Sequence, residues 1–130
     1  MRRTILIAVA AAAALAWNVS SAGAIHPTTF KAKRASCGVI KGQRAMGCRS
    51  PVLPGRHGFI KLGPSGPAHL SERGDCPFRD CDKRSRRLPR SKAWRRVGVT
   101  CRVYSFGLRC ENFDNGVHHF VLRRHSWARG

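Results

Sequence analysis

The sequence predicts a small all-β domain that is stapled by disulfides and contains two pseudo-repeated hairpin-plus-strand units and a basic loop. Three observations support this fold class. The chain of 130 residues contains six cysteines. Two pairs of these cysteines enclose short segments whose residues alternate as in a hairpin. Thirteen glycines and seven prolines separate short strand-like runs, as is typical of small β domains.

Residues 1–24 are typical of a secretory signal peptide. A basic start, MRR, precedes an uncharged apolar run over residues 5–17, and the small residues AGA at 22–24 fit a signal-peptidase site. We expect cleavage after Ala24, which leaves residues 25–130 as one domain that is secreted or periplasmic. An uncleaved anchor is the weaker alternative because a membrane span needs about 20 apolar residues. No transmembrane segment is expected after cleavage.

All six cysteines lie in the predicted mature domain, and we expect them to form disulfides. An even number of cysteines in a short exported chain indicates a disulfide framework, since the compartment is oxidising and the apolar core is small. Zinc binding is the alternative, but the spacings C-x10-C, C-x4-C and C-x8-C differ from the paired short spacings of structural zinc sites. The sequence leaves the pairing open among these residues: Cys37, Cys48, Cys76, Cys81, Cys101 and Cys110.

Residues 101–110, CRVYSFGLRC, read as a disulfide-closed hairpin when the segment is folded about its centre. The turn is then Ser105-Phe106. Since side chains alternate across a strand, the cysteines and an aliphatic pair share one face while two arginines share the other. The facing pairs are Cys101 with Cys110, Arg102 with Arg109, and Val103 with Leu108.

The same operation on residues 37–48, CGVIKGQRAMGC, pairs Cys37 with Cys48 and Val39 with Met46, with Gly42-Gln43 at the turn. Glycine first in a two-residue turn favours a type II′ hairpin. Each hairpin is followed by a glycine, a histidine and an apolar strand, GRHGFIKL in one case and GVHHFVLR in the other. The chain therefore resembles two diverged copies of one unit.

Between the two copies lies the most basic part of a basic chain. Lys and Arg number 25 against 6 Asp and Glu, a formal net charge of +19, which attracts polyanions. A tight loop, DCPFRDC, leads into residues 82–96, which we expect to form an exposed basic loop because Pro89 disfavours a continuous helix there. Arginine forks suit phosphate, carboxylate and sulfate. The candidate anion-binding residues are Lys83, Arg84, Arg86, Arg87, Arg90, Lys92, Trp94, Arg95, Arg96, Arg102 and Arg109.

Two of these choices depend on particular physical arguments. Trp94 is included because an exposed indole stacks on a base or a sugar ring, as Trp127 near the C-terminus also could. Arg102 and Arg109 are included because like charges that face each other on paired strands cost stability. An anion held between them would offset that cost.

The closing pattern GVTCRVYSFGLRCEN, followed by HHFVLRR, resembles a family of small exported bacterial cysteine-rich domains of unknown function. Members of that family carry a phenylalanine and a cysteine hairpin near the N-terminus, here Phe30 and Cys37 to Cys48, and a central cysteine. They end in Gly-Leu-x-Cys-x-Asn, then Gly-His-Gly-Phe-x-Leu. His119 stands here in place of the family's second glycine. The resemblance implies bacterial export and an all-β fold, and it implies no activity. The matching positions are Gly107, Leu108, Cys110, Asn112, Gly116 and Phe120.

Catalytic and metal chemistry have weak support in the sequence. A pair of histidines, His118-His119, invites comparison with pancreatic-type ribonucleases, but the Cys-Lys-x-x-Asn-Thr-Phe signature around their lysine is absent. Adjacent strand residues point to opposite faces, so these two histidines do not reach one ion together. We expect no cofactor, no metal and no catalytic residues.

The sequence therefore predicts a secreted cationic domain that binds acidic polymers or anionic surfaces. Nucleic acid, lipopolysaccharide, acidic glycans and lipid headgroups all fit this description, because such binding depends mainly on charge. Two alternatives remain. One is a structural or protein-interaction module of the bacterial envelope, and the weaker one is a secreted hydrolase.

Overall fold

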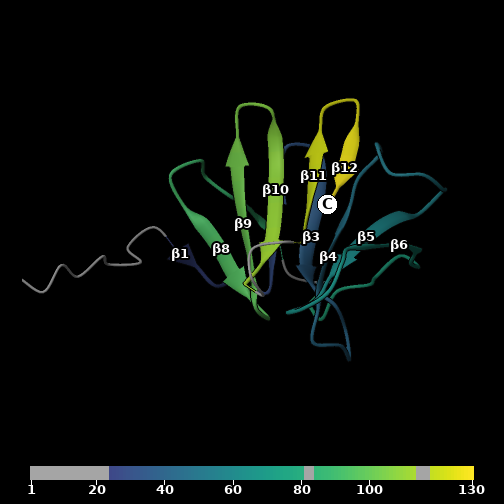
Figure 1. Ribbon diagram of the computed structural model, residues 1–130. Helices are drawn as coiled ribbons and strands as arrows, with labels where there is room; N and C mark the ends of the chain where they lie inside the picture. Colours follow the sequence, from purple (N-terminus) through teal and green to yellow (C-terminus); the bar gives the residue numbers. More distant parts are fainter. Residues whose placement is uncertain (1–23, 81–83, 114–117) are drawn as a thin grey trace, which may run out of the picture.

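The computed structural model describes residues 24–80, 84–113 and 118–130, and these residues form twelve strands and no helix. The strands make two six-stranded sheets (Figure 1). One sheet has the order β1 (Ala24–Ile25), β8 (Ala93–Arg96), β9 (Val99–Tyr104), β10 (Gly107–Asn112), β11 (His119–Arg123) and β12 (Trp127–Arg129). The other has the order β6 (His69–Glu72), β5 (Gly58–Leu62), β4 (Met46–Arg49), β3 (Ala35–Val39), β2 (Thr29–Ala32) and β7 (Arg86–Arg87). The all-β prediction is confirmed.

The two sheets follow the same plan. Five consecutive strands, β2 to β6 in one sheet and β8 to β12 in the other, form an antiparallel meander. A two-residue strand precedes each meander, and it pairs in parallel with the first strand of the opposite meander. Thus β1 lies beside β8, and β7 lies beside β2. Each half of the chain therefore supplies one edge strand to the sheet of the other half.

Both predicted hairpins and both returning strands occur within this plan. Cys101 is the register partner of Cys110, Arg102 of Arg109, and Val103 of Leu108. In the first half Cys37 faces Cys48. The returning strands are β5 and β11, which pair with β4 and β10.

The first hairpin has a longer turn than the sequence predicts, because its strands end at Val39 and Met46. The backbone N–H of Ile40 still donates to the carbonyl of Ala45 at 2.9 Å, but that of Lys41 donates to Pro77 at 3.0 Å. The N–H of Lys41 lies on the edge of β3 that faces away from β4, and the turn is closed by the N–H of Gln43, which donates to the carbonyl of Ile40 at 3.3 Å. Gly42 adopts a positive φ of 70°, which fits its expected place in the turn.

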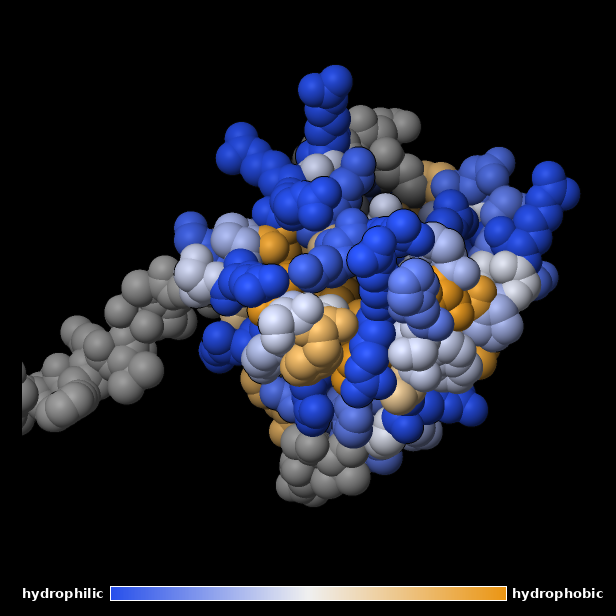
Figure 2. Space-filling view, turned by 90° about the horizontal axis from the view of Figure 1, so that it is seen from above, coloured by the Kyte–Doolittle hydropathy of each residue, from blue (hydrophilic) through white to orange (hydrophobic). Residues whose placement is uncertain are grey.

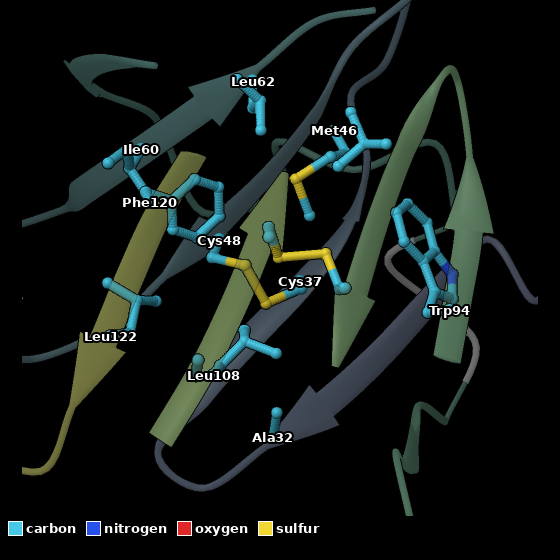
Figure 3. Close-up of a cluster of buried hydrophobic side chains, with 14 of the residues drawn as sticks. Ala32, Cys37, Met46, Cys48, Ile60, Leu62, Trp94, Leu108, Phe120 and Leu122 are labelled. Carbon is cyan, nitrogen blue, oxygen red and sulfur yellow. A yellow bond between two sulfur atoms is a disulfide. The ribbon is translucent and has the colours of Figure 1, made fainter. Parts of the chain in front are cut away.

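The core lies between the sheets and is centred on two disulfides (Figure 3). Cys37–Cys48 joins β3 to β4, and Cys101–Cys110 joins β9 to β10. All four sulfurs belong to residues that are at most 1% exposed. Cys76 is also disulfide-bonded, while its expected partner Cys81 lies outside the described residues.

Residues 82–96 do not form the single exposed loop that the sequence predicts. From residue 84 onward they contain strands β7 and β8, and Leu88, Ala93 and Trp94 are buried. These apolar side chains are scattered among basic ones, so the charge of the segment hid its strand pattern. The residues that the structure describes contain no helix long and apolar enough to cross a membrane. The predicted signal peptide, apart from Ala24, lies outside the described residues.

Candidate anion-binding surface

The predicted anion-binding residues lie in several parts of the surface rather than in one. Lys83 lies outside the described residues. Arg84, Arg86 and Arg96 line a hollow of about 540 Å³ beside β1, whereas Lys92 is exposed in the turn before β8. The remaining described residues divide between one end of the sandwich and the outer face of β8 to β10.

Trp94 is a correction, because it is part of the core and not of the surface. It has no exposed area, its ring centroid lies 5.0 Å from that of Phe30, and its indole N–H donates to the carbonyl of Pro27 at 2.6 Å. Trp94 and Phe30 are register partners of Cys101 and Cys37, so they hold equivalent places in the two halves. The two rings are tilted by 44° and neither has exposed area, so no ring face is open to a ligand.

Basic side chains from three separate segments surround a hollow of about 470 Å³ at one end of the sandwich. The hollow lies where the β2–β3, β9–β10 and β11–β12 turns meet β7. A second hollow of about 360 Å³ shares Lys33 and Arg87 with the first and adds Arg90. We call this region the cationic end, and its basic residues are Lys33, Arg34, Arg87, Arg90, Arg123 and Arg124.

The walls of the two hollows, as far as the structure describes them, include no Asp or Glu. Figure 2 shows this end of the molecule from above, with hydrophilic side chains around smaller apolar patches. The sequence prediction named Arg87 and Arg90 but missed Lys33, Arg34, Arg123 and Arg124. These four missed residues lie at two turns that are far apart in the chain, and only the pairing of the strands brings them together.

Two aromatic side chains stand at the edge of the cationic end. Tyr104 and Phe106 are stacked, with ring centroids 5.1 Å apart and planes within 7°. They are 39% and 46% exposed, and Phe106 lines the hollow of about 470 Å³ at the cationic end. The guanidinium carbon of Arg123 lies 5.8 Å from the centre of the Phe106 ring, a distance at which cation–π attraction operates.

The predicted arginine pair lies on the outer face of the β9–β10 hairpin. Arg102 is exposed, and it faces Arg109 in the register of the strands. A guanidinium nitrogen of Arg109 lies 3.5 Å from a carboxylate oxygen of Glu111, with both side chains about 40% exposed. Glu111 therefore offsets part of the repulsion between Arg102 and Arg109. From the sequence alone, a bound anion is expected to do this.

No protein-family model matches the chain, and no curated protein or solved structure matches it.

The remaining predictions about chemistry concern histidines. Within the described residues, no group of three His, Cys, Asp or Glu side chains is placed to hold a metal ion. His119 is half-buried, and its backbone exchanges two hydrogen bonds with Gly130, at 2.9 and 3.0 Å. Trp127 is half-buried and packs against the core, with Arg129 6.0 Å from the centre of its ring. The candidate site is thus the cationic end, with the aromatic side chains at its edge.

Proposed function

We propose that this chain is an exported cationic domain that binds acidic polymers or anionic surfaces through its cationic end. The observation that carries the proposal is the gathering of six basic side chains around two hollows whose described walls hold no carboxylate. Bringing like charges together costs folding free energy. A polyanion that neutralises them recovers this energy and releases its own counterions.

A protein-interaction module of the envelope is the second candidate. Exposed aromatic side chains favour it, since Tyr and Phe are enriched at protein interfaces and Tyr104, Phe106 and Phe113 are all at least 39% exposed. The two candidates differ in their response to salt. Polyanion binding weakens steeply as salt is added, whereas an interface of packed aromatic groups responds little.

Binding of the mature chain to labelled heparin, inorganic polyphosphate and vesicles that contain phosphatidylglycerol tests the proposal. The test variant combines Arg34→Gln, Arg87→Gln and Arg124→Gln. The matched control combines Lys41→Gln, Arg44→Gln and Arg79→Gln, which are exposed in the β3–β4 turn and the loop that contacts it. Both variants lose three positive charges, so they differ only in where the charges stood.

We expect the test variant to bind anionic vesicles on the order of 100-fold more weakly, at about 1 kcal/mol for each basic residue near the surface. The control should lose much less. The slope of log affinity against log salt should also become shallower by about 2 to 3 for the test variant. Equal losses in the two variants would show that the charge acts without a site.

A further inference from the structure

The exposed aromatic side chains of the domain gather on one hairpin. Among the described residues, the large apolar side chains with substantial exposure are Tyr104, Phe106 and Phe113. Tyr104 ends β9, Phe106 lies in the β9–β10 turn, and Phe113 directly follows β10. Two of the three rings have an arginine close to them, Arg123 at Phe106 and Arg95 at Phe113, each at 5.8 Å.

These residues form a strip along the outer face of the hairpin. The backbone N–H of Phe113 donates to the carbonyl of Gly98 at 3.0 Å, so Phe113 lies beside the start of β9. Tyr104 is six residues further along β9, or about 20 Å at roughly 3.4 Å per residue. Arg102 and Arg109 lie between the two ends, because both alternate outward with Tyr104.

Within the part of the chain that the structure describes, Tyr104, Phe106 and Phe113 are left exposed. In the first half the equivalent outer face is occupied by Phe59 and Phe78, which form a small core of their own with Ile40 and Ala45. In the second half Arg102 and Arg109 are exposed and half-exposed, respectively. The strip thus combines exposed aromatic rings with arginines, and a partner of complementary chemistry offers both planar faces and negative charge.

We propose that the outer face of the β9–β10 hairpin binds single-stranded nucleic acid, which names the polymer class of the function proposed above and depends on that function. Bases stack on aromatic side chains whatever their sequence, and arginines hold the phosphates. Heparin supplies negative charge without aromatic rings, and a duplex keeps its base faces stacked inside. Arg123, which lines the hollow of about 470 Å³ and lies against Phe106, connects the strip to the cationic end.

Fluorescence anisotropy of three probes tests this inference: oligo(dT) of about 15 nucleotides, the duplex that it forms with oligo(dA), and heparin. The variants are Phe113→Leu and Tyr104→Leu, which keep an apolar side chain but remove the ring. Tyr104→Phe is the matched control because it keeps the ring. Both positions are exposed, so urea unfolding should place each of the three variants within about 0.5 kcal/mol of the parent.

We expect each leucine variant to bind oligo(dT) about 5- to 150-fold more weakly, the range that corresponds to the loss of one stacked base. Tyr104→Phe should bind oligo(dT) within twofold of the parent, and all variants should bind heparin equally well. If oligo(dT) and heparin both bind but the leucine variants lose nothing, the nucleic-acid inference is wrong and polyanion binding stands. Tighter binding of the duplex than of oligo(dT) would also overturn it. If no probe binds, the proposed function fails together with the inference.

Discussion

The two halves of the domain share one plan of strands and differ most on their outer faces. Cys37–Cys48 and Cys101–Cys110 occupy the same places in the two meanders. In the first half, Gly38 follows Cys37 and Gly47 precedes Cys48. A Cβ on Gly47 would lie 2.1 Å from the ring of Phe59. In the second half, the equivalent positions are Arg102 and Arg109.

This difference separates what the fold needs from what the surface does. The inward positions keep the same kind of residue in both halves, with Phe30 and Trp94 as the clearest pair. The outward positions diverge completely, because glycine permits Phe59 and Phe78 to cover one face with rings 5.8 Å apart. Arginine keeps the other face open and charged. We therefore expect the open face to bind a partner and the inward positions to stabilise the fold.

The largest expected effect concerns the inward pair. Trp94→Ala and Phe30→Ala should each lower the free energy of unfolding by about 3–5 kcal/mol, because each removes a fully buried aromatic ring. Urea denaturation measures the change. Trp94→Phe serves as the control, since it keeps a ring against Phe30. If Trp94 bound ligand instead, Trp94→Phe would lose affinity for heparin; we expect that affinity to be unchanged.

A smaller effect should distinguish the two outer faces. Gly47→Ala forces a Cβ into the ring of Phe59 and close to the carbonyl of Ile60, and we expect it to destabilise the fold by about 1–3 kcal/mol. Arg109→Ala at the equivalent position should cost less than about 1 kcal/mol, because it removes only a partly exposed ion pair. Thermal or urea unfolding of both variants provides the comparison. Similar losses at both sites would mean that the second face is also packed.

The smallest effect concerns the carboxylate beside the arginine strip. Glu111→Gln releases Arg109 from its 3.5 Å ion pair and removes one negative charge from the face. We expect polyanion affinity to rise about two- to fivefold, which corresponds to roughly 0.5–1 kcal/mol, with stability nearly unchanged. Titration with oligo(dT) at low salt measures the gain. Weaker binding would indicate that the Arg109–Glu111 pair positions the arginine for its ligand.

The hairpins could be predicted from the sequence because each carries its own register. Two cysteines and an alternating aliphatic pair leave a single folding-back that buries all four, and the structure has that register in both hairpins. The end of the first hairpin could not be predicted in the same way. Its ladder ends at the bond from Ile40 to Ala45, and the next residue, Lys41, donates on the other edge of the strand to Pro77, which comes from a loop 36 residues later in the chain.

The cationic end could not be predicted from the sequence because it depends on how separate strands pair. Lys33, Arg123 and Arg87 approach one another only after β7 pairs with β2 and the two sheets pack together. Local charge density pointed to residues 82–96 instead, and there it concealed Trp94. A run of basic residues thus indicated the character of the surface but not its position.

The exchange of edge strands has a consequence for how the chain holds together. Because β7 borders the sheet of the first half, Ile25 of β1 remains after the expected cleavage to border that of the second, and the two sheets share one core, neither half is a self-sufficient module. If the two halves were produced as separate polypeptides, each would lack one border strand and could regain it only from the other. Fragment complementation, and not independent folding of either piece, is the behaviour that this interlocked connectivity imposes.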